Sequence, residues 1–380
     1  MNVLFISNDP QMFKEGSAVR TRMRTYASKI GTLHILSRAP ASSDSEDGTL
    51  MLHGRAVSKV RGWRQLLVEA KALIAEHSID VVSTQDPFEY GYIGMKAVEG
   101  TSAKLHVQIH TDFLSPWFTR GGIFRSPQLS VPAKNIVRKQ LAKRVLKKAD
   151  GIRVVSQRIA NSLRLAYGNN IVEPVVIPIA VSSVVPPRVD LPEPHLPFML
   201  ITVGRLESEK RIDDILVALS SLRDAYPTVG LVIVGEGNQR KHLEEKVAEL
   251  NLEDKVTFLG SRNDAWGLMQ SAQAYIQASA YEGYGMTLVE AALARIPIIT
   301  SDVGIVGEVL VGYEDVLVSP PGDPTNLAYH IISLVEDVAT RERLVRSAQA
   351  KVLAHLAQNA QTEDRIVSNL RSVEGGSRGV

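Results

Sequence analysis

Residues 281–291 read Tyr-Glu-Gly-Tyr-Gly-Met-Thr-Leu-Val-Glu-Ala and place two carboxylates eight residues apart. Glu282 lies in a glycine-flanked turn, whereas Glu290 lies in an apolar stretch, Met286 to Leu293, that we predict to be a helix. The unpaired N–H groups and positive dipole end of such a helix attract phosphate. A carboxylate accepts two hydrogen bonds side by side, which suits vicinal hydroxyls. The stretch therefore predicts a site for a sugar nucleotide.

The simpler interpretation is an ordinary helix N-terminus with an acidic first turn. Glu290 argues against it, because this residue stands beside Val289, Ala291 and Ala292. Carboxylates are rarely placed on an apolar helix without a partner.

A second motif lies about eighty residues upstream, where the apolar strand predicted at 198–203 is followed by Arg205 and Lys210. Ligands of doubly wound sheets collect at the carboxyl ends of strands, so these two cations are placed to meet a diphosphate. The alternative is surface ion pairing with Glu207 and Glu209.

With two further turns, Val234-Gly235-Glu236-Gly237 and Phe258-Leu259-Gly260, these motifs resemble the retaining GT-B glycosyltransferases of family 4 (glycosyl transferase group 1). This family includes bacterial mannosyl- and glucosyltransferases, and the resemblance covers most of the chain. It implies an α/β fold of two Rossmann-like doubly wound domains facing a central cleft. It also implies transfer of a hexose from a nucleotide-diphosphate sugar, UDP- or GDP-linked, to an acceptor hydroxyl with retention of configuration.

The resemblance assigns Arg205 and Lys210 to the donor diphosphate, Glu282 to the transferred sugar and Glu290 to the ribose. Tyr284 departs from the family, in which Phe is commoner, but the contacts there are made by the backbone. The predicted catalytic residues are His110, Glu282, Arg205 and Lys210. The predicted donor-binding residues are Gly16, Ser17, Gly204, Arg205, Lys210, Gly235, Leu259, Arg262, Glu282, Gly283, Tyr284, Gly285, Met286, Thr287 and Glu290.

Three of these predictions lie outside the two main motifs. Gly16 and Ser17 precede a predicted helix, so their amides could reach a phosphate. His110 ends the strand Leu105 to Ile109, and the resemblance places a histidine at such a strand end beside the donor sugar. Arg262 follows Phe258-Leu259-Gly260 and is predicted to lie against the nucleobase, with a solvated loop arginine as the alternative.

No metal is predicted, because the chain has no Asp-x-Asp motif and the two cations can stabilise the departing diphosphate. No cofactor is predicted either. Val234-Gly235-Glu236-Gly237 begins like a dinucleotide fingerprint, but Arg240 replaces the third glycine. No carboxylate can be assigned as a covalent nucleophile, and the resemblance implies a front-face mechanism in which the departing phosphate guides the incoming hydroxyl.

Composition fits a globular protein of two domains, with 380 residues, 44% apolar and 22% charged. The absence of cysteine excludes disulfides and fits a reducing cytoplasm, and no signal peptide or membrane span is expected. Apolar runs alternate with amphipathic stretches, as in parallel α/β folds. The predicted domains are 1–185 for the acceptor, 186–356 for the donor and a returning C-terminal helix at 357–380, with a proline-rich linker from Pro178 to Pro197.

Residues 113–149 contain nine Lys or Arg and no Asp or Glu. They include Trp117, Phe118, Arg120, Ile123, Phe124 and Arg125, followed by a predicted helix with Val137, Leu141 and Val145 on one face. This pattern predicts peripheral binding to anionic lipid. The resemblance implies the inner face of the plasma membrane as the location and a sugar or lipid-linked glycan of the cell envelope as the acceptor, because several related glycosyltransferases act on lipid-linked acceptors from the cytoplasmic face. No nucleic-acid motif accompanies the basic stretch, so nucleic acid is not expected as a partner.

Two other classes of protein fit part of the pattern. One is an enzyme of similar architecture with different chemistry, such as a sugar-nucleotide epimerase, which would turn over donor without acceptor. The other is a non-catalytic nucleotide-sugar binding subunit, against which the presence of Arg205, Lys210, Glu282 and Glu290 argues.

Overall fold

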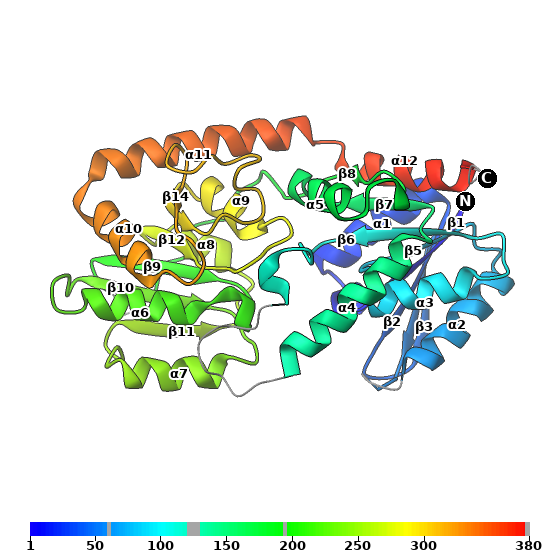
Figure 1. Ribbon diagram of the computed structural model, residues 1–380, viewed down its shortest axis with the longest axis horizontal. Helices are drawn as coiled ribbons and strands as arrows, with labels where there is room; N and C mark the ends of the chain where they lie inside the picture. The colour runs from blue at the N-terminus through cyan, green and yellow to red at the C-terminus, as the bar shows by residue number, and fades with distance from the viewer. Residues whose placement is uncertain (59–61, 120–129, 193–195, 377–380) are drawn as a thin grey trace. The chain divides into compact units, whose positions relative to one another are not determined.

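The computed structural model describes residues 1–58, 62–119, 130–192 and 196–376, with the backbone alone at 130–132 (Figure 1). The chain forms two compact units. Among the described residues, the first contains 1–58, 62–119, 130–178 and 361–376, and the second contains 179–192 and 196–360. Each is built on a mostly parallel sheet with helices, which confirms the predicted α/β fold class of two Rossmann-like domains.

The sheet of the first unit has the strand order β3-β4-β2-β1-β5-β6-β7-β8, and within it β3 runs antiparallel to β4. Its strands are β1 (Asn2–Ser7), β2 (Thr32–Arg38), β3 (Ser43–Asp47), β4 (Leu50–Arg55), β5 (Val81–Thr84), β6 (Lys104–Ile109), β7 (Gly151–Val154) and β8 (Val175–Val176). Its helices are α1 (Ala18–Ile30), α2 (Trp63–Glu76), α3 (Glu89–Val98), α4 (Ser130–Leu146), α5 (Gln157–Tyr167) and α12 (Thr362–Gly375).

Both faces of this sheet are covered, which explains why its central strands are continuous apolar runs. In β1, Val3 and Phe5 pack in one cluster with residues of α1 and α12. Leu4 and Ile6 pack in another with residues of α2 and α3. All four side chains are fully buried.

The sequence analysis did not predict the hairpin of β3 and β4. Strand β3 reads Ser-Asp-Ser-Glu-Asp and lies at the edge of the sheet, where polar side chains face solvent, so it lacks an apolar pattern. The turn follows Asp47, and Gly48 has a φ of 66° there, a left-handed conformation that glycine adopts readily. The Asp-Gly pair at 47–48 was the available signal for this hairpin.

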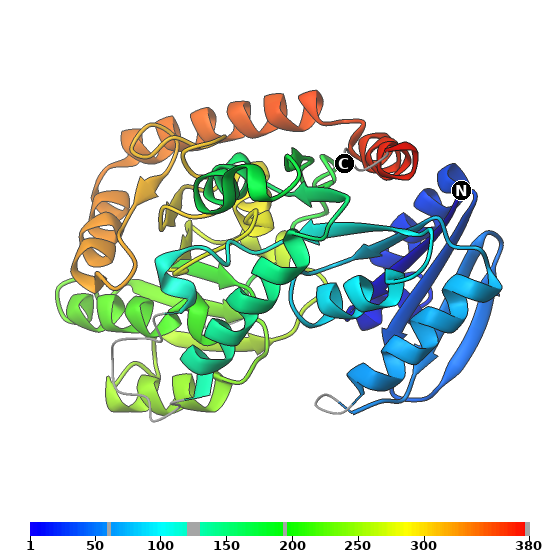
Figure 2. The ribbon, with the colours of Figure 1, turned by 45° about the vertical axis from the view of Figure 1, so that its right-hand side comes forward.

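The C-terminal helix α12 packs on the first unit, with the red end of the ribbon beside α1 in both views (Figures 1 and 2). Leu370 is fully buried, the Asn369 Oδ1 atom lies 2.9 Å from His106 Nε2, and the Arg371 guanidinium donates to the Lys29 carbonyl at 2.7 Å. The sequence analysis predicted a C-terminal helix at 357–380 that returns to the first domain. The units divide after Pro178 and after Ala360, whereas the sequence analysis placed these divisions after 185 and 356.

The predicted apolar face of α4 is buried only in part. Val145 is fully buried and Leu141 is half-buried, but Val137 is 58% exposed. Residues four apart on an α-helix differ by about 40° around its axis, so the three side chains lie on one side of α4, but only the end of that side is buried. The last turns of α4 pack against α3, where a Cβ on Gly91 would lie 3.0 Å from Val145 Cγ1.

Of the aromatic residues predicted to reach a membrane, Trp117 is half-buried and Phe118 is buried. Phe118 is 5% exposed and packs between the rings of Phe88 and Phe113, 5.8 and 6.4 Å between centroids. Burial in this aromatic cluster removes Phe118 from any surface. Arg120, Ile123, Phe124 and Arg125 lie outside the described residues.

The sheet of the second unit has the order β11-β10-β9-β12-β13-β14, all parallel. Its strands are β9 (Phe198–Val203), β10 (Val229–Val234), β11 (Val256–Gly260), β12 (Ala274–Gln277), β13 (Ile298–Thr300) and β14 (Leu317–Val318). Its helices are α6 (Ile212–Leu222), α7 (Arg240–Glu249), α8 (Ala265–Met269), α9 (Met286–Leu293), α10 (Pro324–Glu336) and α11 (Val338–Gln358). Helix α9 has the predicted bounds.

The strand order places a topological switch point between β9 and β12. The chain runs from β9 outward through β10 to β11, and then returns to the opposite side of β9 to form β12. The connections that follow two such neighbouring strands run in opposite directions, so a crevice forms at the carboxyl ends of the strands. Ligands of open α/β sheets bind in this crevice.

Candidate functional site

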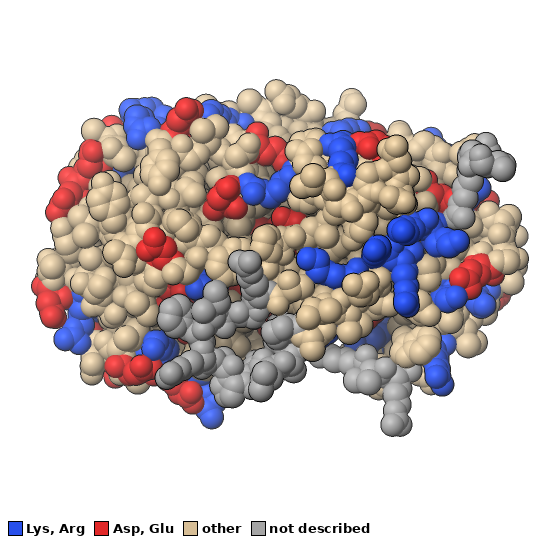
Figure 3. Space-filling model, viewed as in Figure 1, with Lys and Arg blue, Asp and Glu red and all other residues tan. Residues whose placement is uncertain are grey.

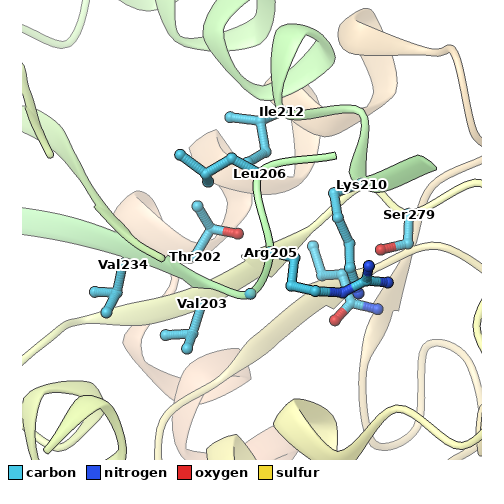
Figure 4. Close-up of a pocket in the computed structure, with 10 residues that line it drawn as sticks. Thr202, Val203, Arg205, Leu206, Lys210, Ile212, Val234 and Ser279 are labelled. Atoms are coloured by element: carbon cyan, nitrogen blue, oxygen red, sulfur yellow. The ribbon is translucent and has the colours of Figure 1, made fainter. Parts of the chain in front are cut away.

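A pocket lies at the carboxyl ends of β9 and β12 in the second unit. It is lined by residues that follow β9 and by two polar residues of the β12 end, Gln277 and Ser279 (Figure 4). Arg205 and Lys210, the two predicted diphosphate contacts, are both among its lining residues. The pocket therefore coincides with the switch point of the sheet.

Glycines bring the loops around this pocket close together. A Cβ on Gly235 would lie 1.8 Å from the Gly204 carbonyl oxygen, and a Cβ on Gly237 would lie 2.3 Å from that of Leu206. Gly204 itself has a φ of 157°. A Cβ on Gly204 would lie 3.9 Å from Nζ of Lys210, so the lysine side chain passes close to this glycine. Side chains at Gly235 or Gly237 would push the loop that carries Arg205 and Lys210 out of place.

Lys210 and Glu282 form an ion pair across 72 residues of sequence, with 2.5 Å between Nζ and Oε1. The Ser279 hydroxyl donates to the same Glu282 oxygen at 2.8 Å. Both side chains of the pair are mostly buried, 19% exposed for Lys210 and 15% for Glu282. The fold thus brings a predicted diphosphate contact and a predicted sugar contact together.

Arg205 is held less firmly. Its guanidinium is 73% exposed and lies 3.2 Å from Glu209 Oε1, so the ion pair considered as the alternative from sequence does form. Exposed pairs of this kind contribute about 0.2–1 kcal/mol, so Arg205 can leave Glu209 for a stronger anion at little cost. Arg205 extends toward the Lys210 side of the pocket (Figure 4).

Helix α9 begins with an open N-terminus. Its N-cap residue, Gly285, has a φ of 83° and no side chain to accept from the first-turn amides. Those amides belong to Met286 and Thr287, two of the predicted donor-binding residues. An uncapped helix start of this kind is a site for an anion.

Glu290 lies on the same helix and is partly exposed. Burial raises the pKa of its carboxyl group to about 7. No hydrogen bond or ion pair to this carboxylate is present within the described part of the chain, in contrast to Glu282. Glu290 is therefore free to accept hydrogen bonds from a ligand, and it gains affinity for them as it ionises.

Tyr284, the departure from the family pattern, has a structural partner. Its ring is buried and its hydroxyl lies 2.9 Å from Nε2 of His355 on α11. Burial raises the pKa of Tyr284 and lowers the pKa of His355, so both groups are neutral at pH 7. The hydroxyl that a phenylalanine would lack ties the Glu282–Gly285 turn to α11.

We expect Tyr284→Phe to lower the free energy of unfolding by about 1 kcal/mol, because one buried hydrogen bond is lost while the ring still fills its place. Urea unfolding followed by circular dichroism would measure this. Tyr329→Phe is the matched control, since that ring is 66% exposed on α10. Equal stability of wild type and Tyr284→Phe would show that the bond to His355 contributes nothing.

Two residues at the pocket were not predicted. Ser279 and Gln277 are polar and buried at the end of the otherwise apolar strand β12. A polar residue at the carboxyl end of a buried parallel strand was the available signal.

Arg262 lies just beyond β11 and is paired with Asp264, with 2.8 Å from Nε to Oδ1 and 2.6 Å from the guanidinium to Oδ2. Leu259, within β11, is half-buried. The Arg262 side chain is 43% exposed. It can therefore turn toward a base stacked over the end of β11, provided that it gives up its contact with Asp264.

The remaining predicted residues belong to the first unit. Ser17 caps α1, with Oγ accepting from the Arg20 amide at 3.0 Å, and its own amide donates to the Lys14 carbonyl at 3.2 Å. Gly16, with a φ of 74°, has open space where a Cβ would stand. Of the two amides proposed from sequence, that of Ser17 is thus already engaged.

His110 follows β6 and has an enclosed Nε2 atom without a partner among the described residues. Burial, together with the smaller effect of the charges of Arg153 and Arg22, lowers the pKa of His110 to about 3. The imidazole is therefore neutral at pH 7 and can donate or accept one hydrogen bond, but it supplies no positive charge.

Within the described ranges, no group of three or more His, Cys, Asp or Glu is arranged to hold a metal ion. No described helix combines the length and apolar character needed to cross a membrane.

Residues 188–351 match the family described as Glycosyl transferases group 1. Glycogen synthase of Mycobacterium tuberculosis is 32% identical over 158 residues, 41% of this chain and 38% of that protein. The lipopolysaccharide core biosynthesis glycosyltransferase LpsD of Rhizobium meliloti is 30% identical over 176 residues, 46% of this chain and 50% of that protein. The chain thus matches half or less of the length of these relatives.

Solved structures show the same fold over nearly the whole chain. Sucrose-phosphate synthase of Thermosynechococcus elongatus superposes with a TM-score of 0.77 at 20% identity, covering 97% of this chain and 99% of that one. HepE of Anabaena, in complex with UDP and glucose, gives 0.72 at 20% identity and covers 98% and 100%. These likenesses establish the two-domain GT-B fold, and the pocket lies within the residues that match the family model.

Proposed function

We propose that this protein is a retaining, metal-independent glycosyltransferase that moves a hexose from a nucleotide-diphosphate sugar to an acceptor hydroxyl. The observation that carries the proposal is the Lys210–Glu282 pair beside Arg205, at the switch point of a domain that matches the glycosyl transferases of group 1.

The chemistry requires charge separation. As the bond between sugar and phosphate breaks, negative charge grows on the diphosphate and positive charge on the sugar. Arg205, Lys210 and the open start of α9 would stabilise the departing diphosphate more strongly in the transition state than in the ground state. Glu282, oriented by Lys210 and Ser279, would face the sugar, and Glu290 would accept from the ribose hydroxyls.

Retention and the lack of a metal requirement rest on this same set of residues. The carboxylate of Glu282 is engaged by Lys210 and Ser279, which suits a role in orienting the sugar rather than attacking it. The departing phosphate would then guide the acceptor hydroxyl on the same face. His110 would add a neutral hydrogen-bonding group beside the sugar.

UDP-sugars are the first donors to test, because HepE was solved with UDP-glucose and the pneumococcal transferase GtfA with UDP and N-acetylglucosamine. A thermal-shift screen of UDP-, GDP- and ADP-sugars with EDTA present would identify the donor, since a ligand at a hundred times its Kd stabilises by roughly 2.7 kcal/mol. Proton NMR of the product would report the anomeric configuration. No stabilisation by any donor would overturn the proposal.

The same assay separates the competing classes. Conversion of donor to an epimer without acceptor would identify an epimerase. Donor binding without transfer to any glycan or lipid-linked acceptor would identify a binding subunit.

We further propose that the enzyme works in the cytoplasm at the inner membrane surface, on a sugar or lipid-linked glycan of the cell envelope. Figure 3 shows Lys and Arg side chains gathered over α4. Lys143, Arg144 and Lys147 are exposed there, as are the apolar Ile136 and Val137, at 52% and 58%. The relation to LpsD, a lipopolysaccharide core enzyme, points to the same class of acceptor.

Changing Lys139, Lys143 and Lys147 together to Glu is expected to abolish sedimentation with anionic vesicles at low salt, because each basic residue near such a surface adds roughly 1 kcal/mol of attraction. The matched control changes Arg223, Lys241 and Arg346 of the second unit to Glu, with the same change in net charge. Equal binding by both triple variants, or no binding by the wild type, would remove the membrane from the proposal.

A further inference from the structure

Gln277, the last residue of β12, has a buried amide nitrogen without a partner. The residue is 4% exposed, and Nε2 meets no acceptor among the described residues. A buried donor that lacks an acceptor destabilises the fold, so such groups in a native structure call for an explanation.

The other end of the amide is fixed. Oε1 accepts from the Tyr275 hydroxyl at 2.8 Å and from the Thr287 hydroxyl at 3.0 Å, and these two hydroxyls lie 2.8 Å apart. Tyr275 is fully buried, and burial raises the pKa of its hydroxyl, which therefore keeps its proton and remains a donor. With both hydroxyls donating to Oε1, Nε2 is the end of the amide that lacks a partner in the described structure.

Gln277 also lines the pocket that contains Gly204, Arg205, Lys210 and Ser279. Figure 4 shows Arg205, Lys210 and Ser279 around the same opening. The Glu282 carboxylate nearby is already engaged by Lys210 and Ser279. A ligand bound in this pocket could supply the missing acceptor, and two neighbouring cations favour one that is negatively charged.

We propose that Gln277 is a donor-binding residue whose Nε2 group donates a hydrogen bond to an oxygen of the bound diphosphate. The inference rests on the proposed function, because it takes the ligand of this pocket to be a nucleoside diphosphate or its sugar. It adds a neutral, directional contact to the two cations. The Tyr275 and Thr287 hydroxyls act as positioning groups that hold the amide ready.

The rival explanation is a water molecule trapped beneath the ligand. A trapped water would satisfy Nε2 in both the free and the bound protein, and nucleotide binding would not then depend on the amide. Substitution at Gln277 separates the two explanations, since leucine keeps the approximate size of the side chain and removes the donor.

The test is titration calorimetry with UDP, or with GDP or ADP if that diphosphate stabilises the wild type more, and with the corresponding nucleoside. Gln277→Leu should weaken diphosphate binding about tenfold and leave nucleoside binding unchanged, because a hydrogen bond to a charged oxygen is lost. Gln277→Glu should weaken it further, since a carboxylate would face the diphosphate. Gln358→Leu, at an exposed glutamine that ends α11, is the matched control.

Equal diphosphate affinity of wild type and Gln277→Leu would overturn the inference, as would equal losses for diphosphate and nucleoside. If Gln277→Leu does not fold, Tyr275→Phe carries the test, with an expected loss of a few-fold for the diphosphate alone. No loss in a folded Tyr275→Phe variant would then count against the inference. A wild type that binds no nucleoside diphosphate would instead refute the proposed function.

Discussion

Replacing Lys210 by alanine is expected to leave the fold intact and to lower turnover by about a hundredfold or more, because a charge-assisted contact that strengthens in the transition state is lost. The substitution also leaves Glu282 without its cation in a mostly buried position, with the Ser279 hydroxyl as its remaining partner in the described structure. Arg205→Ala should lower turnover to a similar extent, since its pairing with Glu209 in the free protein is weak.

Steady-state rates at saturating donor, with circular dichroism to establish folding, would measure the effect. Lys241→Ala is the matched control, because that lysine is 89% exposed on α7 and lies outside the pocket. Unchanged turnover in both Lys210→Ala and Arg205→Ala would falsify the assignment of these residues to the diphosphate.

The two carboxylates are expected to respond differently to conversion to glutamine. Glu290→Gln should weaken binding of the free nucleoside diphosphate about tenfold at pH 8, because an ionised acceptor of ribose hydroxyls is lost. Glu282→Gln should spare the nucleoside diphosphate and impair use of the intact donor, since this residue would contact the sugar. Calorimetry with both ligands separates the effects, and equal losses in both variants for both ligands would sink this division of roles.

The affinity ratio between wild type and Glu290→Gln should also depend on pH. Burial raises the pKa of Glu290 to about 7, so the group is mostly protonated at pH 6 and mostly ionised at pH 8. The ratio should therefore be small at pH 6 and grow as the pH rises through 7. Taking the ratio cancels titration of the nucleotide phosphate, which both proteins share. A ratio that is flat from pH 6 to 8 would show that the charge of Glu290 does not contribute to binding.

The same raised pKa of Glu290 makes stability fall with rising pH, whereas it makes nucleotide binding grow. A carboxyl group whose pKa is higher in the folded than in the unfolded protein binds more protons when folded. The stability of the second unit should therefore fall as the pH rises from about 4.5 to 7, over the window between the ordinary pKa and the raised one. Nucleotide binding and stability thus make competing demands on Glu290.

The sequence determined the fold class because parallel sheets bury both faces, and their strands are then recognisable as continuous apolar runs. Strands β1, β9 and β10 were predicted on this ground, and α9 from the glycine-containing turn before an apolar stretch. The β3–β4 hairpin was not predicted, because an edge strand such as β3 has no requirement for apolar side chains. The apolar face predicted for α4 is buried only in part, because packing against α3, rather than spacing along the helix, decides which of its residues are buried.

At the site, the sequence by itself determined which residue types are present: two cations after a strand, two carboxylates around a helix start and glycines between them. Their pairings were decided by tertiary structure. The strand order brings the end of β12 beside the end of β9, and this places Glu282 on Lys210 and leaves Glu290 unpaired in the described chain. The same packing decides two further sets of hydrogen bonds. One joins Tyr284 to His355, and the other joins Gln277 to Tyr275 and Thr287. A hydrogen bond requires that elements far apart in the chain are positioned to within a few tenths of an ångström. Composition and sequence spacing do not contain this information.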